Sequence, residues 1–258
     1  MRTPDSPPAA FSHQVRRCFG RQAAHYEQGA QLQAAMAWRL AHLCRHLALP
    51  SGPCADLGAG SGLLARAIAQ QRPALELLRL DNCPELLAQG LSRAPGPALQ
   101  WDLEQGLPPQ LEQAALLVSN FALQWLEQPE RELQRWCQKL QPGGWLALAV
   151  PTAGSFAPWR AAAASAGVPF TGLGLPDAAS LEAVARQDLI LHCCRRLHFS
   201  RASQDGLAFL RQIKAIGAQA SRRAPLSPTQ LRQLLAHWPT ASKPQPDWQV
   251  LLVLGRKP

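Results

Sequence analysis

Between Cys54 and Val150, short apolar runs alternate with stretches of helical periodicity. The apolar runs fall at residues 54–57, 75–80, 98–101, 115–119 and 145–150, with helical patterns near 62–71, 84–93 and 129–140. Strands that alternate with helices form βαβ units around a parallel sheet, and ligands bind at the carboxyl ends of its strands. The alternation predicts an α/β fold with a doubly wound, mostly parallel, Rossmann-like sheet.

Patterns on either side complete this sheet. Residues 11–47 carry apolar positions at helical spacing, residues 189–199 alternate in part like a strand, and 248–255 form a last apolar run. Helical patterns at 207–216 and 228–238 lie between these last two strands. We expect seven strands and four parts: an N-terminal helical arm or lid (1–50), a core (51–202), a helical cap insertion (203–247) and the last core strand (248–258).

Glycine and proline mark the expected interruptions. The Pro-Gly-Gly run at 142–144 predicts a turn between a helix and the following strand. Prolines at 151, 158, 169 and 176 indicate a less regular region after that strand.

Composition excludes several classes of protein. With 258 residues, 47% hydrophobic and 17% charged, the chain is neither disordered nor collagenous nor a coiled coil. Its seven cysteines are scattered without a metal-ligand spacing, which favours a reducing compartment and no metal site. We find no signal-peptide pattern and no apolar run long enough to span a membrane, so we expect a cytoplasmic protein without a membrane partner.

The net charge of +9 is unevenly distributed. It amounts to +3 over residues 1–21, −2 over 22–150 and +8 over 151–258. A basic chain suggests nucleic acid as a partner, and a basic RNA-binding protein or RNA methyltransferase is one alternative. We find no RNA-binding module and no aromatic and glycine strand pattern for stacking bases, so we expect no nucleic-acid partner.

The segment Asp56–Gly62, DLGAGSG, follows a predicted strand and opens a predicted helix. Glycines there allow a tight turn and a close approach to a ligand, and the helix N-terminus offers unpaired N–H groups. A dinucleotide-binding fingerprint would have glycine or alanine at position 63, where this chain has Leu63. Asp81 follows the second strand, where its carboxylate can accept hydrogen bonds from ribose hydroxyls.

This spacing resembles the Asp/Glu-x-Gly-x-Gly-x-Gly loop of class I S-adenosylmethionine (SAM) methyltransferases. The resemblance implies that the glycines contact the amino-acid end of SAM and that the acidic residue after the third strand lies beside the adenine amino group. The residues it assigns to SAM binding are Gln33, Asp56, Gly58, Gly60, Gly62, Asp81, Asn82, Asp102, Leu103 and Asn120.

The segment after the fourth strand narrows the reaction. It reads Asn120–Trp125, NFALQW, and lacks the Asn/Asp-Pro-Pro-Tyr/Phe motif of enzymes that methylate exocyclic base nitrogens. It also lacks a cysteine nucleophile for C5-cytosine chemistry.

Several further segments resemble the malonyl-acyl-carrier-protein O-methyltransferases of biotin synthesis. They are FGRQAAHY at 19–26, SNFALQW at 119–125, IKAIGA at 213–218 and LSPTQL at 226–231. The resemblance implies methyl transfer from SAM to the free carboxylate of a malonyl thioester on acyl carrier protein or CoA. Other small-molecule carboxylate or quinone methyltransferases and a catalytically silent SAM-binding protein are the alternatives.

The same resemblance places Tyr26, the only tyrosine, at the malonyl pocket as the catalytic residue. We expect Gln124, Trp125 and Lys214 to bind the substrate beside it, although Trp125 and Tyr26 also suit core packing and Lys214 a solvated helix face. Acyl carrier proteins are acidic, so basic residues of the C-terminal region are candidates for docking them. These candidates are Arg195, Arg196, Arg201, Arg211, Arg222 and Arg223.

Overall fold

The structure is a computed structural model that describes residues 8–91, 93, 94, 96–200, 205–239 and 247–258. These residues form a seven-stranded sheet in the order β3-β2-β1-β4-β5-β7-β6. Its strands are β1 (Cys54–Leu57), β2 (Leu78–Asp81), β3 (Ala98–Gln100), β4 (Ala114–Asn120), β5 (Leu140–Pro151), β6 (Ile190–Phe199) and β7 (Trp248–Arg256).

Strands β1 to β5 pair in parallel, and β7 runs antiparallel to both β5 and β6. In the register, Asp56 of β1 lies beside Arg79 of β2 and Val118 of β4. The carboxyl ends of these three strands therefore meet at one edge. The doubly wound, mostly parallel sheet that the sequence predicts is confirmed.

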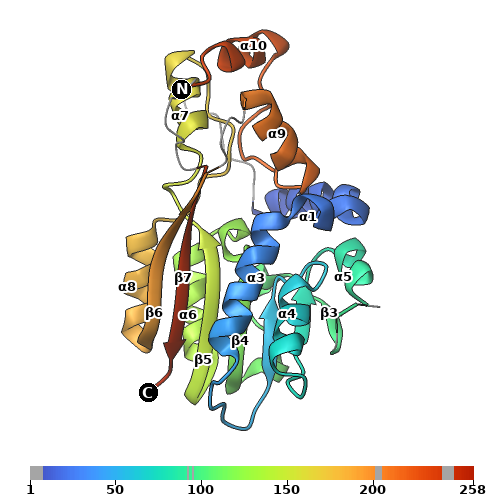
Figure 1. Ribbon diagram of the computed structural model, residues 1–258, viewed down its shortest axis with the longest axis vertical. Coiled ribbons are helices and arrows are strands. Elements are labelled where there is room, and N and C mark those ends of the chain that lie inside the picture. Colours follow the sequence, from blue (N-terminus) through green and yellow to red (C-terminus); the bar gives the residue numbers. More distant parts are fainter. Residues whose placement is uncertain (1–7, 92, 95, 201–204, 240–246) are drawn as a thin grey trace.

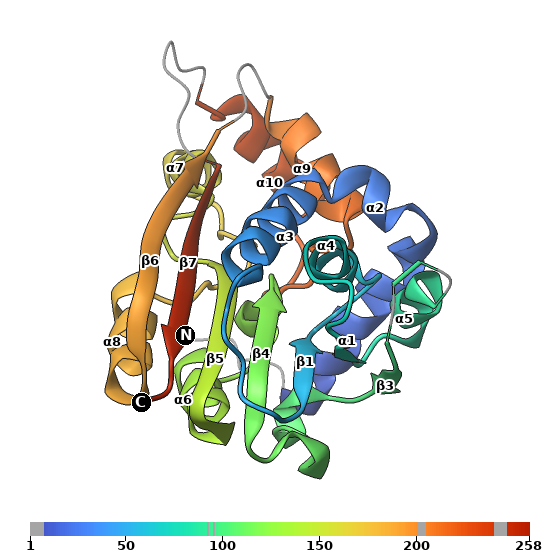
Figure 2. The ribbon, with the colours of Figure 1, turned by 60° about the horizontal axis from the view of Figure 1, so that its bottom comes forward.

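Helices cover both faces of the sheet (Figure 2). On one face, α3 (Gln31–Cys44) and α4 (Leu63–Gln71) pack on β1, β4 and β5 through an apolar core. On the other, α6 (Pro129–Lys139) and α8 (Ala178–Asp188) bury Trp136 and Leu181 against the strands. Strand β4 is buried on both sides from Ala114 to Ser119, as expected for the centre of a parallel sheet.

The other helices lie mainly around the carboxyl edge. They are α1 (Pro8–Gln22), α2 (Tyr26–Gly29), α5 (Pro84–Gly90), α7 (Ala157–Ser165), α9 (Gly206–Ala215) and α10 (Pro228–Ala236). Four 3-10 turns connect elements: η1 (Ala23–His25), η2 (Leu103–Gln105), η3 (Pro109–Leu111) and η4 (Leu123–Trp125).

Helices α7, α9 and α10 form a cap beyond the strand ends, next to α1 (Figure 1). Phe156, Trp159 and Phe209 pack edge-on or tilted, with ring centroids 5.9 to 6.1 Å apart, and form the centre of the cap. Helices α9 and α10 lie between β6 and β7 in the chain, so the predicted helical insertion before the last strand is present.

The N-terminal helical arm that the sequence predicts is divided into more than one helix. Between α1 and α3 the chain passes through η1 and the four-residue α2, and Ala30 leaves the helical region with ψ of 38°. A Cβ on Gly29 would come within 2.8 Å of the Ile216 side chain in the cap. The chain therefore bends between α1 and α3 where it contacts the cap, and the helical periodicity of the sequence does not predict this bend.

Two further expectations were wrong. Strand β5 begins at Leu140, so the Pro-Gly-Gly run forms an irregular start of the strand, where Gly143 has φ of +79° and the β4–β5 register shifts. The region after β5 contains α7 and α8, which the prolines obscured. Pro158 lies in the first turn of α7, where proline is tolerated, and the Asp177 carboxylate caps α8 by accepting the Ser180 N–H.

Candidate functional site

A cavity opens at the carboxyl edge of the sheet, bounded by the glycine loop, the N-terminal helices and the cap. Together with the open solvent at its mouth it encloses about 1230 Å³ of empty space. Most residues predicted to bind SAM line it: Gln33, Asp56, Gly58, Gly60, Asp81, Asn82, Asp102, Leu103 and Asn120. Gly62 does not line the cavity but forms the N-cap of α4.

The glycine loop turns tightly against its neighbours. Gly58, Gly60 and Gly62 have φ between +54° and +82°, a region that residues with a side chain rarely adopt. The N–H groups of Gly58 and Ala59 both donate to the Leu80 carbonyl, at 2.8 Å each. A Cβ on Gly58 would lie 2.1 Å from that of Ala122, so only glycine fits at this position.

Asp81 joins the loop to β2. Its Oδ2 accepts the Gly60 N–H and its Oδ1 the Cys83 N–H, both at 2.8 Å. Burial raises the pKa of Asp81 to about 6 although these backbone donors favour the charged form. Each carboxylate oxygen retains a lone pair that can accept a ligand hydroxyl.

Asp102 is tied to the N-terminal arm. Ser12 of α1 donates to Asp102 Oδ2 at 2.9 Å, and Asn82 Nδ2 donates to Ser12 Oγ at 3.3 Å. The other carboxylate oxygen of Asp102 caps η2 through the Glu104 N–H. Ser12 was not predicted, because no local pattern in the sequence links α1 to the strand ends 70 and 90 residues later.

Asn120 makes a second link to this arm. Its Nδ2 donates to the Gln33 carbonyl of α3 at 2.9 Å, whereas its buried Oδ1 has no hydrogen-bond partner. Phe121 follows with φ of +60° and turns the chain sharply, which places Ala122 under the glycine loop. The free Oδ1 is an acceptor available to a ligand donor.

Asp56 has an unusual environment. It is 1% exposed, and neither carboxylate oxygen has a hydrogen-bond partner. Burial and the nearby Asp81 raise the pKa of Asp56 to about 7, while the charge of Arg79 lowers it, as does the Ala65 N–H, which lies outside hydrogen-bonding geometry. A buried carboxylate without partners favours a ligand with a positive charge.

Aromatic side chains also line the cavity. Tyr26 packs edge-on against Phe19, with ring centroids 6.2 Å apart, and Phe19 does the same against Trp125 at 5.4 Å. Burial, and next the charge of Asp81, raises the pKa of the Tyr26 phenol, so it is neutral at physiological pH. Sequence reasoning missed the other aromatic side chains that line the cavity, which are Phe19, Trp101, Phe121, Phe156, Trp159 and Trp248.

The predicted substrate residues are only partly brought together. Tyr26, Gln124 and Trp125 line the cavity, and Gln124 Nε2 donates to the Phe121 carbonyl at 2.6 Å. Lys214 is exposed on α9 and does not line the cavity, whereas the neighbouring Ile213 does. The helix turns its apolar side inward, so the structure does not support a role for Lys214 in substrate binding.

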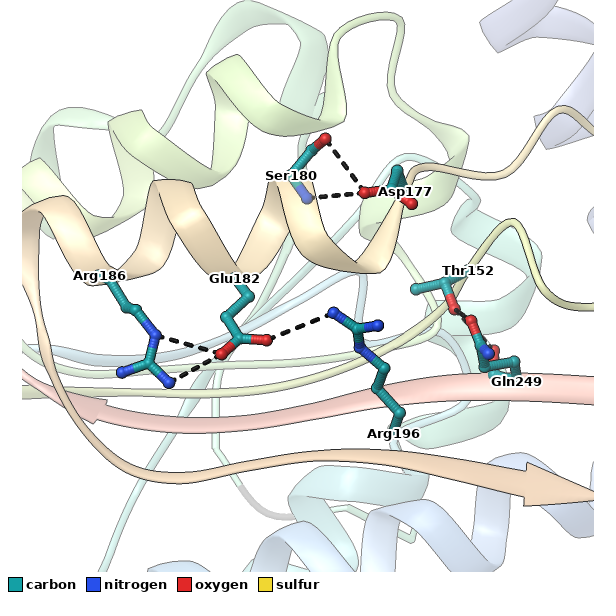
Figure 3. Close-up of polar contacts among 7 residues, drawn as sticks. All are labelled: Thr152, Asp177, Ser180, Glu182, Arg186, Arg196 and Gln249. Carbon is teal, nitrogen blue, oxygen red and sulfur yellow. Dashed lines mark hydrogen bonds and ion pairs between the residues drawn. The ribbon is translucent and has the colours of Figure 1, made fainter.

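The candidate docking arginines do not share one face. Arg195 and Arg196 are successive residues of the edge strand β6, so their side chains lie on opposite faces of the sheet. Arg196 Nη2 lies 3.6 Å from Glu182 Oε2 on α8, which also pairs with Arg186 (Figure 3).

The remaining candidates belong to the C-terminal cap region. Arg222 pairs with Glu127 at 2.5 Å and lies over the Phe11 ring, whereas Arg211 and Arg223 are exposed. Arg201 is outside the described residues.

Among the described residues, no group of three or more His, Cys, Asp or Glu side chains is arranged to hold a metal ion. In the same part of the chain, no helix combines the length and apolar character that a membrane crossing requires.

The sheet order and the glycine loop between β1 and α4 are those of the Rossmann-like methyltransferase fold, and Asp56 in β1 and Asp81 at the end of β2 line its cavity. Residues 55–148 match the family described as "Methyltransferase domain". SAM fits this site: unpartnered Asp56 suits its amino group, Asp81 its ribose hydroxyls, and the free Asn120 Oδ1 one further donor.

Two curated relatives match a longer stretch of the chain than this domain and point to a more specific family. The chain is 32% identical over 228 residues to the biotin biosynthesis bifunctional protein BioCD of Bordetella avium, covering 86% of this chain and 48% of that protein. It is 35% identical over 132 residues to the malonyl-[acyl-carrier protein] O-methyltransferase of Methylococcus capsulatus, covering 50% of this chain and 48% of that protein. The chain thus spans about half the length of these curated relatives, and its resemblance to the malonyl-acyl-carrier-protein O-methyltransferases is confirmed.

Solved structures agree on the fold. A putative methyltransferase from Bacillus halodurans has a TM-score of 0.59 at 14% identity, covering 85% of this chain and 98% of that chain. The YcgJ protein from Bacillus subtilis has a TM-score of 0.57 at 14% identity with the same two coverages.

Substitution of Gly58 tests the glycine loop. We expect Gly58→Ala to weaken SAM binding at least tenfold, because the added Cβ would collide with Ala122 and shift the loop. Gly167→Ala is the matched control, since Gly167 has φ of +63° with nothing within 4 Å of its Cβ position. Calorimetric titration of both variants with SAM would contradict this view of the loop if their affinities fell equally.

Proposed function

We propose that this protein transfers the methyl group of SAM to the free carboxylate of a malonyl thioester carried by acyl carrier protein. The similarity to BioCD carries the proposal, because it extends over 86% of the chain, whereas the methyltransferase domain covers only residues 55–148. The arm and the cap outside that domain supply Tyr26, Phe156 and Trp159 to the second half of the cavity.

The proposed reaction needs little proton chemistry. A carboxylic acid with a pKa near ~4 is already ionised at neutral pH, so the nucleophile needs no general base. SAM, when bound, supplies an electrophilic methyl group whose carbon–sulfur bond breaks as the carboxylate oxygen forms its bond to carbon. Catalysis then consists of aligning the carboxylate with the methyl group and removing water from around both. Such a reaction suits a cavity whose aromatic part has few titratable groups.

Different residues of this chain would bind the cofactor, hydrogen-bond to the substrate carboxylate and exclude water. The glycine loop, Asp56 and Asp81 hold the cofactor side, and Asn120 anchors the end of β4 to α3. The neutral Tyr26 phenol, with its raised pKa, can donate a hydrogen bond to a carboxylate but cannot act as a base at neutral pH. Aromatic rings of the arm and cap exclude water and can face a sulfonium cation.

A free carboxylic acid is a second candidate substrate. The trans-aconitate 2-methyltransferase of Streptomyces avermitilis is 38% identical over 118 residues, covering 42% of this chain and 43% of that protein. Trans-aconitate is also a carboxylate, so the same alignment chemistry applies. Because this relative matches a shorter segment of the chain than BioCD does, the malonyl thioester remains our first choice of substrate.

Methyl transfer from labelled SAM tests the proposal directly. We expect label in the methyl ester of malonyl-acyl-carrier protein, with less in malonyl-CoA and none in total RNA. Label confined to trans-aconitate would replace the substrate by a free acid. Label confined to RNA would overturn carboxylate methylation and support the alternative that the net charge of +9 suggests.

Tyr26 is the residue whose role is most open to test. We expect Tyr26→Phe to lower kcat on the malonyl thioester about tenfold or more, while the SAM affinity changes less than about twofold, because only the hydrogen-bond donor is lost. Phe19→Leu is the control for aromatic packing in the same wall. Unchanged turnover in Tyr26→Phe would reduce Tyr26 to a packing role.

We further propose that the acidic carrier protein docks on the cap through its exposed arginines. Arg211 and Arg223 are exposed, whereas the charges of Arg196 and Arg222 are already paired. Exposed positive charge steers an acidic partner and raises its association rate in a salt-dependent way.

Charge reversal separates docking from catalysis. We expect Arg211→Glu and Arg223→Glu each to raise KM for the carrier-protein substrate about three- to tenfold and to leave KM for malonyl-CoA and SAM unchanged. Arg256→Glu is the matched control, because exposed Arg256 ends the antiparallel strand β7 at the opposite edge of the sheet. An equal effect of all three reversals would reject a localised docking site.

A further inference from the structure

Arg79 is an arginine buried inside the sheet layer. It lies in the middle of β2, is 1% exposed and does not line the cavity. The register places it directly beside Asp56 on β1. Leu57 and Leu80, the next residues on the two strands, belong to the core on the α6 and α8 side, so Asp56 and Arg79 share the opposite face, under α4.

The guanidinium is closely enclosed by small residues. A Cβ on Gly90 would lie 2.5 Å from Arg79 Nη1 and 2.9 Å from the Ser61 carbonyl, and one on Gly62 would lie 3.6 Å from the same nitrogen. Arg79 Nη2 donates to the Gly96 carbonyl at 3.3 Å. The arginine therefore fills the space between the glycine loop and the C-terminal end of α5.

Opposite charges without hydrogen-bond partners occupy this layer. Arg79 Nε and Nη1 and both carboxylate oxygens of Asp56 are buried and unpartnered. An isolated buried charge is strongly disfavoured, and an opposite charge on the neighbouring strand reduces that cost through space.

Other charged groups act on the same pair. Asp81 on β2 raises the pKa of Asp56, and Arg66 on α4 acts against the charge of Arg79. Asp102, which follows β3, raises the pKa of Asp81. Arg79 is thus the positive side chain that offsets the burial of Asp56 and its repulsion from Asp81.

We propose that Arg79 is a positioning residue for cofactor binding, which favours the charged form of the Asp56 carboxylate and supports the glycine loop from behind, so that the amino group of SAM meets an anion. Arg79 acts through Asp56 and touches no ligand. The inference rests on SAM as the cofactor and is independent of which carboxylate is methylated.

The pH dependence of cofactor binding tests this role. S-adenosylhomocysteine, which keeps the amino-acid group of SAM, would be titrated by calorimetry from pH 6 to pH 9 into the wild type, Arg79→Met and Arg79→Lys. Loss of the Arg79 charge raises the pKa of Asp56, so the acid form persists to higher pH. We expect the affinity of Arg79→Met at pH 7 to fall about fivefold for the first pKa unit gained and about tenfold for each further unit, with the loss shrinking as the pH rises to 9.

Three further variants separate this role from a purely structural one. Arg72→Met removes another arginine that donates to main-chain carbonyls, those of Cys44 and Leu47, and should leave the pH profile unchanged. Arg79→Lys retains a positive charge on a different side chain. The pH midpoint of its S-adenosylhomocysteine binding should therefore lie between the midpoints of the wild type and Arg79→Met. Asp56→Asn should remove the pH dependence that Arg79 controls.

Each outcome is decisive. A loss of affinity in Arg79→Met that is equal at all pH values, or an identical shift in Arg72→Met, overturns the proposal. If Arg79→Met does not fold, Arg79→Gln, which also removes the charge, takes its place, and an unchanged midpoint in that variant overturns the proposal as well. A wild-type protein that binds no S-adenosylhomocysteine at any pH would contradict the cofactor assignment and the proposed function instead.

Discussion

The close approach of the glycine loop to its neighbouring strands is the contact on which the ligand site depends. The loop closes because Gly58 and Ala59 share the Leu80 carbonyl, and because Gly58 lies against Ala122 with no room for a side chain. This packing fixes the ends of β1, β2 and β4 relative to one another. Asp56, Asp81 and Asn120 reach a common cavity as a result.

The N-terminal arm is part of the same site. Ser12 bonds to Asp102, and the Gln33 carbonyl accepts a hydrogen bond from Asn120, so α1 and α3 are joined to residues after β3 and β4. Tyr26 lies between these two anchors in the chain and lines the cavity. Hydrogen bonds with residues after β3 and β4 therefore connect the arm to the rim of the cavity.

The two walls of the cavity have different physical characters. Beside the glycine loop, Asp81 accepts hydrogen bonds from backbone N–H groups whereas Asp56 has no hydrogen-bond partner, and burial raises the pKa of both carboxyl groups. The cap and arm side is dominated by aromatic rings, including Phe156, Trp159 and Trp248. One side thus suits a charged cofactor, and the other excludes water from the reacting groups.

Local features of the sequence determined the order of strands and helices, the glycine loop and the acidic residues at the strand ends, because apolar periodicity and turn chemistry act over a few residues. Helices α7 and α8 were missed although proline at a helix start and the Asp177 cap were visible, since prolines also mark loops. Only the tertiary structure brought Ser12 to Asp102, set Arg79 beside Asp56, turned Lys214 outward and separated Arg195 from Arg196. Those relations depend on strand register and on which helix face is buried, and both are decided by packing between segments far apart in the chain.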